Sequence, residues 1–469
     1  MIIDPPNGAN TKLGGYDFYR EVLKSPKYVV APMVDQSEYA WRILSRRYGA
    51  QLCYTPMLHA RLFAEQHSYA PEFFTTGEFD RPLIVQFCAN DPKILLKAAL
   101  AVQPYCDAVD INLGCPQGIA RKGHYGAFLM EDWKLIASMI TILHENLNIP
   151  VTCKIRVYPD VNKSIEYAKM VQDAGCQLVT VHGRMREQKG QFSGVADWEQ
   201  IRRIKQELTI PVFANGNILY YEDVQACLDA TGADGVMSAE GNLYNPALFA
   251  NKYPVIYEIA QEFLDICTST PKSSNLGCIK SHLFKIFHPV IIAYPDLREQ
   301  LNNVATMADC QILIDSYKKR MQPLVKVIKT FGTDEGGYMV IPEYLCQPYI
   351  RDPTLGRNGK AVKNGDGVED GDAGVDVNGK RKLGDGGDGP DKKGDLGVKV
   401  NDLCRCGVNL ASNRCTQGLC RACCGKLGTS LNKRQLQRQK LKARAGNGGM
   451  VVDENEIDWV CQPHMTRRK

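Results

Sequence analysis

The sequence lacks any run of about 18 or more apolar residues, the length that a membrane-spanning helix needs. Residues 1–10 contain Pro5 and Pro6 and lack the apolar stretch of a secretory signal. A disulfide framework is not indicated either, because eleven of the 18 cysteines are scattered singly from Cys53 to Cys346, mostly in apolar stretches. These absences predict a non-membrane protein of a reducing compartment, the cytoplasm or the nucleus.

The composition also lacks extremes. With 44% hydrophobic and 23% charged residues, the chain is not expected to be fibrous or wholly disordered. Its 469 residues exceed the roughly 250–300 that one hydrophobic core serves, so two or three domains are expected. Residues 401–469 hold 13 lysines and arginines against five acidic residues, which indicates either a polyanionic partner or a solvated basic tail.

The dinucleotide-binding pattern Gly-x-Gly-x-x-Gly is absent after the first expected strand, which disfavours a doubly wound open sheet but leaves it as the alternative fold. Between residues 28 and 250, eight short β-branched runs alternate with segments of helical period. This pattern predicts an α/β fold, a (β/α)8 TIM barrel. The expected strands are Tyr28–Val30, Gln51–Tyr54, Leu83–Phe87, Ala108–Asn112, Val151–Val157, Leu178–His182, Val212–Ala214 and Gly235–Ser238. The expected helices include residues 38–48, 132–147, 164–174, 197–208 and 221–230.

Other segments flank the barrel. Residues 1–27 are an N-terminal segment. In residues 251–350, apolar residues recur at helical spacing over 255–266, 279–292 and 310–321 and no strand pattern occurs, which predicts a small all-α domain. Residues 351–400 predict a disordered Gly/Asp-rich linker, followed by a Cys-rich module at 401–430 and a basic tail at 431–469. In the all-α domain, Lys280, His282, Lys285 and His288 could line a nucleic-acid face, or could be the solvated side of a helix.

Polar residues follow most of the expected strands, at the end of a barrel where reactive groups project. The glycine-rich turns after the seventh and eighth strands, around Gly216 and Gly241, predict a phosphate site and therefore a phosphorylated cofactor. The other strand ends carry Ala31-Pro32-Met33-Val34, Gln86, Asn112-Leu113-Gly114-Cys115-Pro116, Lys154 with Arg156, and His182-Gly183-Arg184.

As a set, these residues resemble the tRNA-dihydrouridine synthase family, from Tyr28 to about Phe249. The motifs that carry the resemblance are Ala31 to Val34, Asp110 to Gln117, Lys154 to Arg156, Val181 to Arg184, Gln188 to Trp198, Asn215 to Asn217 and Asn245-Pro246. The Cys-Pro-Gln turn, followed by Lys122, Gly123 and Tyr125 to Ala127, and the long C-terminal extension look most like the eukaryotic branch named for uridines 16 and 17 of the tRNA D-loop.

The resemblance implies FMN over the barrel mouth, NADPH or NADH as reductant, tRNA as substrate and a helical domain that helps to hold the tRNA; a monomer is expected. It places flavin contacts at Pro32, Met33, Val34, Gln86, Lys154 and His182, and phosphate contacts at Asn215, Gly216, Asn217, Ala239 and Glu240. Many relatives carry Gly-Arg where this chain has Ala239-Glu240. Because a carboxylate should not face a phosphate, we expect backbone N–H groups to bind there and Glu240 to point away.

Chemistry assigns the central role to Cys115. Reduction of uridine to 5,6-dihydrouridine adds hydride from reduced FMN at C6 of uracil, so C5 must receive a proton from an acid. A thiol, with a reference pKa of about 8.5, is protonated at neutral pH yet acidic enough to act. Lys154 would stabilise the negative charge of reduced flavin near N1, and Asn112, Arg156 and Arg184 are expected to contact a uridine that has swung out of its stack.

The Cys-rich module predicts a zinc site, since it supplies more than the four thiolates that structural zinc needs. A cluster of free or redox-active thiols is the alternative. The candidate ligands are Cys404, Cys406, Cys415, Cys420, Cys423 and Cys424.

Two other functions stay open beside the FMN-dependent tRNA-dihydrouridine synthase. One is an FMN-dependent oxidoreductase of a free pyrimidine, of the dihydroorotate dehydrogenase type, which would leave the helical domain and the basic tail without a use. The other is a non-catalytic tRNA-binding protein, against which the intact set of Cys115, Lys154 and His182 argues.

Overall fold

The computed structural model describes residues 12–350, apart from 191–192, 292, 327–329 and 335–337. These described residues belong to one compact unit. The predicted linker beyond residue 350, the Cys-rich module and the basic tail lie outside the described residues. Within the described part of the chain, no helix is long and apolar enough to cross a membrane.

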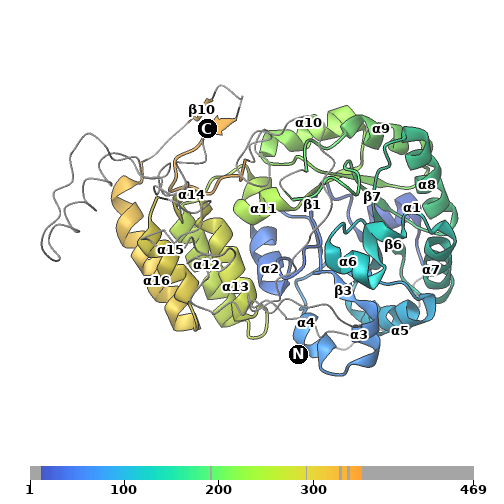
Figure 1. Ribbon diagram of the computed structural model, residues 1–469, viewed down its shortest axis with the longest axis horizontal. Coiled ribbons are helices and arrows are strands. Elements are labelled where there is room, and N and C mark those ends of the chain that lie inside the picture. Colours follow the sequence, from blue (N-terminus) through green and yellow to red (C-terminus); the bar gives the residue numbers. More distant parts are fainter. Residues whose placement is uncertain (1–11, 191–192, 292, 327–329, 335–337, 351–469) are drawn as a thin grey trace, which may run out of the picture. The chain divides into compact units, whose positions relative to one another are not determined.

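Eight parallel strands close into a barrel (Figure 1). The first strand, β1, pairs with both β2 and β9, and β2 pairs with β4, so the sheet has no open ends. The closure confirms the predicted TIM barrel and rules out the doubly wound open sheet. The barrel strands are β1 (Tyr28–Val30), β2 (Leu52–Tyr54), β4 (Leu83–Cys88), β5 (Ala108–Leu113), β6 (Val151–Arg156), β7 (Val179–His182), β8 (Val212–Asn215) and β9 (Gly235–Ser238), and the two-residue β3 (Leu58–His59) pairs with the end of β4.

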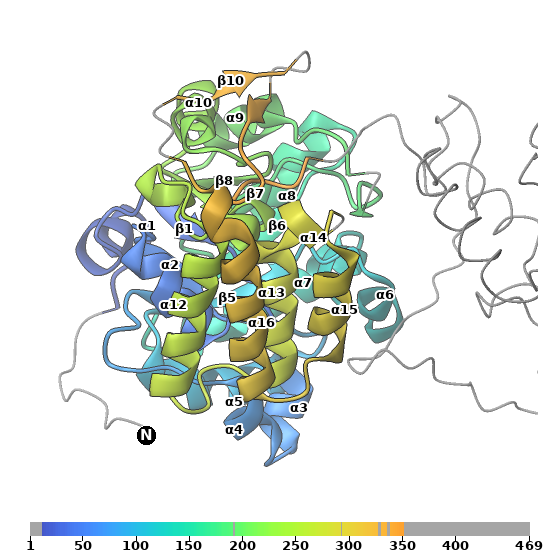
Figure 2. The same cartoon turned by 90° about the vertical axis from the view of Figure 1, so that its left-hand side faces the viewer.

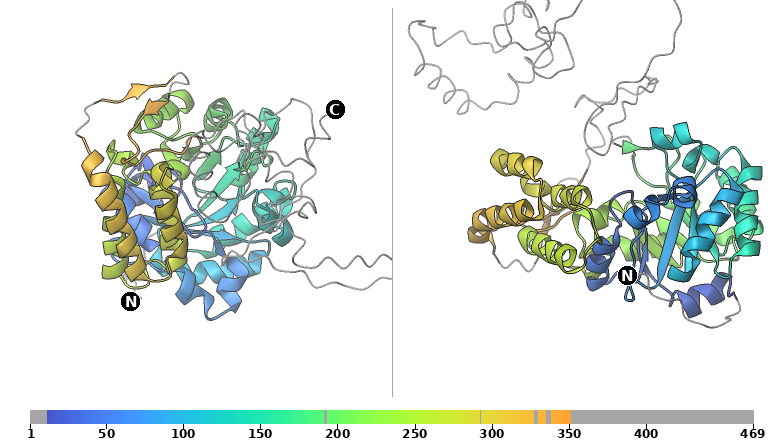
Figure 3. Two further views of the ribbon diagram at one scale, coloured as in Figure 1. Left: turned by 60° about the vertical axis from the view of Figure 1, so that its left-hand side comes forward. Right: turned by 90° about the horizontal axis from the view of Figure 1, so that it is seen from below.

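Helices surround these strands (Figure 3). Four of these helices begin with an aspartate whose side chain accepts hydrogen bonds from backbone N–H groups of the first turn. These caps fix where each preceding loop ends, and they are Asp91, Asp132, Asp160 and Asp197. The main helices are α2 (Tyr39–Arg47), α5 (Pro92–Val102), α7 (Trp133–Asn146), α8 (Val161–Asp173), α9 (Trp198–Glu207) and α10 (Tyr221–Thr231). Shorter ones are α1 (Gly15–Asp17), a π-helix (Phe18–Val22), α3 (Ala60–Glu65), α4 (Tyr69–Phe73), α6 (Gly118–Gly123) and α11 (Glu240–Tyr244), with 3-10 turns at Gln103–Tyr105, Gly126–Leu129, Leu248–Ala250 and Gln322–Leu324.

The chain continues with α12 (Ile256–Ser269), α13 (Leu276–Ile286), α14 (His288–Ile291), α15 (Pro295–Asn303) and α16 (Met307–Met321). Helices α12, α13 and α16 run side by side in Figure 2, and the rings of Phe287 and Tyr317 stack at 3.8 Å within their core. The expected helix at 279–292 is divided before Pro289, whose ring lacks an N–H and crowds the preceding turn. The expected absence of strands is wrong, because β10 (Gly332–Thr333) pairs with β11 (Met339–Val340).

Helix α13 packs on α2 of the barrel through one buried histidine. The His282 side chain is fully buried, its ring stacks on Trp41 at 3.9 Å, and Nε2 lies 3.0 Å from a carboxylate oxygen of Glu38. We call these three residues the α2–α13 contact. The possibility that His282 lines a nucleic-acid face is therefore wrong: its position along α13 turns the ring toward the barrel.

Candidate active site

The register of the barrel brings the polar residues of the central strands together at one end. Asn112 on β5 lies beside Lys154 on β6, Arg156 lies beside His182 on β7, and His182 lies beside Asn215 on β8. The Lys154 ammonium donates to Asn215 Oδ1 at 2.8 Å, so residues of β6 and β8 meet inside the barrel. Side chains 61 positions apart in sequence thus form one site at the mouth.

Cys115 sits on a turn that Asn112 holds in shape. Asn112 Oδ1 accepts the backbone N–H groups of Gly114 at 3.1 Å and Cys115 at 2.9 Å. On the other side, Gly126 has φ of +64°, and a Cβ added there would lie 2.9 Å from Cys115 Cβ. Only glycine allows so close an approach at this backbone conformation. The sequence motif included Gly126, but the reason for it appears only in three dimensions.

The Cys115 thiol stays protonated at neutral pH. Burial raises the pKa of Cys115 above its usual value, and this outweighs the opposing effects of the Gln117 backbone N–H and of Arg156 and Lys154. The residue is nonetheless partly exposed, whereas the other ten cysteines in the described part of the chain are buried. A protonated, reachable thiol at the mouth has the chemical properties that a proton donor needs.

Positive groups crowd around Lys154. Burial and the neighbouring Arg156 lower the pKa of Lys154 to about 7, although Asp110 and Cys115 act in the opposite direction. Burial and the charge of Lys154 likewise lower the pKa of His182 well below 6.5, so its imidazole is neutral. A cluster in which the positive side chains lower one another's pKa values fits an anionic group, such as a phosphorylated flavin.

The two arginines at the mouth mainly brace its loops. Arg156 is 7% exposed, and its guanidinium donates to the backbone oxygens of Gly114 at 2.7 Å and Met185 at 2.7 Å. Arg184 donates to His182 Nε2 at 3.0 Å and also to Asn217 Oδ1. The structure thus brings Arg184 to His182, an expected flavin contact, and to Asn217, an expected phosphate contact.

The turn after β8 is shaped for close approach. Gly216 has φ of +118°, and a Cβ there would lie 2.6 Å from Ala196 Cβ and 3.2 Å from the His182 ring. Asn217 follows in the left-handed region at φ of +61°. Burial lowers the pKa values of Lys285 and His288, and the charge of Glu240 opposes this lowering, which places the Glu240 carboxylate near these side chains of α13 and α14.

The remaining expected flavin contacts differ in exposure. Val34 is 50% exposed and Met33 is 9% exposed. Pro32 precedes them in the segment that follows β1. The Gln86 side chain is fully buried, and its amide is bonded at both ends, to Asp110 and to Asn112. It supports the site from within the barrel, and contact with a flavin stays a prediction.

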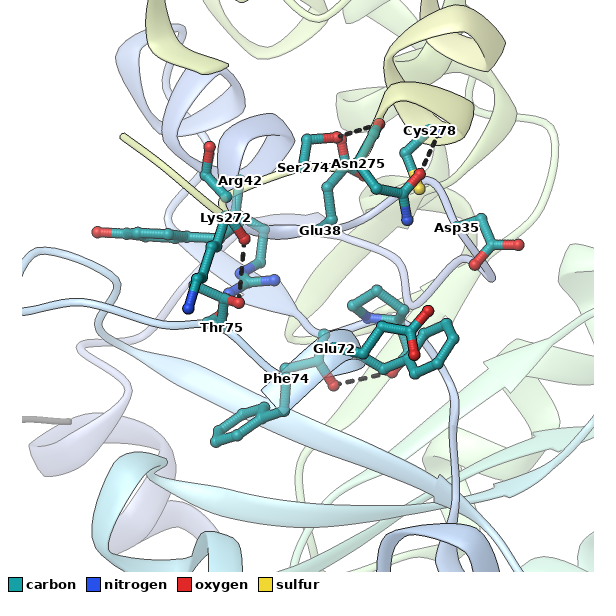
Figure 4. Close-up of a pocket in the computed structure, with 15 residues that line it drawn as sticks. Asp35, Glu38, Arg42, Glu72, Phe74, Thr75, Lys272, Ser274, Asn275 and Cys278 are labelled. Atoms are coloured by element: carbon teal, nitrogen blue, oxygen red, sulfur yellow. Dashed lines mark hydrogen bonds between the residues drawn. The ribbon is translucent and has the colours of Figure 1, made fainter. Parts of the chain in front are cut away.

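A separate cleft lies beside the α2–α13 contact (Figure 4). Asp35, Glu38 and Glu72 give it an acidic lining, with Lys272 at its edge. It contains none of the expected site residues, and sequence periodicity gave no signal for it. No group of three or more histidine, cysteine, aspartate or glutamate residues within the described ranges could hold a metal. The candidate zinc ligands Cys404 to Cys424 lie outside those ranges.

Comparison with known proteins agrees with this site. A model of the family described as dihydrouridine synthase (Dus) matches residues 29–311. A tRNA-dihydrouridine(16/17) synthase-like protein of Mus musculus is 46% identical over 427 residues, covering 88% of each chain. The tRNA-dihydrouridine(16/17) synthase of Schizosaccharomyces pombe is 48% identical and covers 73% of this chain and 92% of its own. That of Saccharomyces cerevisiae is 47% identical and covers 76% and 91%. On its family match, its relatives and its barrel site, the chain belongs to the dihydrouridine synthase family.

Proposed function

We propose that the chain reduces uridine to 5,6-dihydrouridine at positions 16 and 17 of tRNA, with FMN as cofactor and NADPH or NADH as reductant. The observation that carries the chemistry is Cys115, a protonated thiol on a braced turn beside a cluster of cations. The position on tRNA is supported by identity: relatives named for uridines 16 and 17 are 46–48% identical, whereas a mouse relative named for positions 20a and 20b is 37% identical.

The residues at the mouth suit FMN. Lys154 and Arg184 would balance its negative charge, His182 would contact it as a neutral ring, and the backbone at Asn215, Gly216, Asn217 and Ala239 would approach its phosphate. The proximity of Glu240 to Lys285 and His288 supports its pointing away from that phosphate. Pro32, Met33, Val34 and Gln86 are proposed to contact the ring. When bound, FMN supplies the hydride that C6 of uracil accepts.

The protein supplies the proton and the positions. Cys115 Sγ gives its proton to C5 on the opposite face of the base, and Arg156 and Lys154 are the cations that can balance the resulting thiolate. Asn112, Arg156 and Arg184 are proposed as uridine contacts, in addition to the bonds that tie them to the loops. The target base must leave its stack to reach this site.

The variant Cys115→Ala tests the proposal. It should bind FMN and oxidise NADPH as the natural chain does, yet form no dihydrouridine in tRNA, measured by mass spectrometry of digested tRNA. Cys88→Ala, a change at a buried cysteine in the same apolar cluster, is the matched control and should remain active. Normal dihydrouridine formation by Cys115→Ala would contradict the proposal.

Further parts of the function rest on sequence. We propose that residues 28–250 are the catalytic domain and that residues 251–350 help to bind tRNA, as a monomer in the cytoplasm or the nucleus. Zinc is proposed to bind among Cys404, Cys406, Cys415, Cys420, Cys423 and Cys424, and the basic tail to contact RNA phosphates.

A further inference from the structure

A carboxylate inside the barrel has so far appeared only through its charge, which opposes the lowering of the Lys154 pKa. Asp110 on β5 is fully buried. Its two oxygens accept hydrogen bonds from neighbouring strands, one from Gln86 Nε2 at 2.8 Å and one from Thr152 Oγ1 at 2.7 Å. Placing a carboxylate in a barrel core costs several kcal/mol, which a hydrophobic side chain would avoid. The position therefore calls for a role beyond packing.

One of these two hydrogen bonds leads directly to Cys115. Gln86 Oε1 accepts from Asn112 Nδ2 at 2.8 Å, and Asn112 Oδ1 accepts the N–H of Cys115 at 2.9 Å. The other bond, to Thr152, does not lead toward the turn. Asp110, Gln86 and Asn112 thus form a continuous chain of hydrogen bonds, which we call the Asp110 relay.

The direction of the relay follows from its first member. An ionised carboxylate can only accept hydrogen bonds, so Gln86 must turn its NH2 group to Asp110 and its oxygen to Asn112. Asn112 must then turn its NH2 group to Gln86, which leaves its oxygen for the backbone N–H groups of Gly114 and Cys115. Without the carboxylate, the amide groups of Gln86 and Asn112 could both reverse. A reversed Asn112 would turn its NH2 group toward the backbone N–H groups of Gly114 and Cys115, which need an acceptor.

We infer that Asp110 is a positioning residue for Cys115: through Gln86 and Asn112 it fixes the turn that holds the Cys115 thiol at the barrel mouth. This inference rests on the proposed function only for its effect on catalysis. Its effect on the geometry of the turn can be measured without any reaction of tRNA.

The direct test is the rate at which iodoacetamide alkylates Cys115 in the full-length protein, followed by mass spectrometry of the peptide that contains it. Asp110→Leu keeps a side chain that branches at Cγ but removes the acceptor, so the turn should loosen and alkylation should accelerate about threefold or more. In Asp110→Asn, the new amide oxygen can still accept a hydrogen bond from Gln86 if the new NH2 group faces the Thr152 hydroxyl. The alkylation rate of Cys115 in this variant should therefore stay close to that of the natural protein.

Thr152→Val is the matched control, because it removes the hydrogen bond to the same carboxylate that does not reach Cys115. It should lower the melting temperature without changing the alkylation rate. If Asp110→Leu fails to fold, Gln86→Met breaks the relay one step further along and should accelerate alkylation in the same way. If Cys115 in Asp110→Leu is alkylated at the same rate as in the natural protein, the inference is overturned. If Asp110→Leu does not fold, the same result in Gln86→Met would overturn it. Equal acceleration in Thr152→Val would also overturn it.

Steady-state kinetics separate this inference from the proposed function. In Asp110→Leu, kcat for tRNA reduction should fall about 10- to 100-fold with KM for tRNA nearly unchanged. An active Cys115→Ala would refute the proposed chemistry, whereas an unchanged alkylation rate would refute the relay.

Discussion

At the scale of single residues, the contact between Gly126 and Cys115 limits what the active-site turn tolerates. Gly126→Ala would place a Cβ 2.8 Å from the Cys115 carbonyl oxygen, so the turn must shift. We expect at least a tenfold loss of dihydrouridine formation while the protein still folds, on the order of what a small misplacement costs. Gly232→Ala is the control, because Gly232 has the same φ of +64° but no atom within 4 Å of the added Cβ. Equal losses in both variants would assign the effect to backbone strain alone.

The pKa of Lys154 makes a second prediction at this scale. Because this pKa is lowered to about 7, most Lys154 side chains are neutral at pH 8 in the cofactor-free protein. An anionic ligand nearby raises the pKa again, so binding must take up a proton. Titration calorimetry of FMN binding, in two buffers of different ionisation enthalpy, should show more proton uptake at pH 8 than at pH 6. The difference should disappear in Lys154→Met, and its persistence there would assign the proton to another group.

The sequence predicted the principal residues of the site but not their bonds. Cys115, Lys154 and His182 stand out because strand ends in a barrel converge on one rim. Asp110 lay within a recognised motif without a role, since its partners Gln86 and Thr152 come from other strands. Bonds between residues so far apart in the chain depend on register, which periodicity does not determine.

At the scale of elements, the α2–α13 contact is expected to carry much of the stability between the barrel and the helices that follow. His282→Ala removes the ring that stacks on Trp41 and takes one side-chain partner from Glu38, which keeps its hydrogen bond from Ser274. We expect a loss of about 2–4 kcal/mol in the free energy of unfolding, measured with a denaturant. His67→Ala, the same change at an exposed position, should stay within about 0.5 kcal/mol. Equal free energies of unfolding in the two variants would show that the α2–α13 contact does not stabilise the protein.

Strands and long helices were predictable because their apolar periods are strong. All eight barrel strands lie where the pattern placed them, to within one or two residues. Short helices such as α3 and α6 escaped prediction, since one or two turns carry too little periodicity. The helix break before Pro289 was missed although proline is a local signal, because apolar spacing continued across it.

At the scale of the whole molecule, zinc is proposed to bind to the C-terminal cysteines and not to residues 1–350. The purified full-length protein should carry zinc, measured by elemental mass spectrometry, and the double variant Cys420→Ser with Cys423→Ser should lose it. A chain that ends at residue 350 should carry none and still bind FMN, because no candidate metal cluster occurs within the described ranges. Full-length protein without stoichiometric zinc would leave those cysteines as free or redox-active thiols.

The crowding of Lys154, Arg156 and Arg184 has a consequence for the cell as well as for catalysis. Burial lowers the pKa values of Lys154 and Arg156, and the mutual repulsion of the charges at the barrel mouth lowers them further. A ligand that binds only the folded state stabilises it in proportion to its supply. Cells short of riboflavin should therefore lose the polypeptide itself to proteolysis, so that vitamin status would set the amount of this protein and not merely its turnover rate.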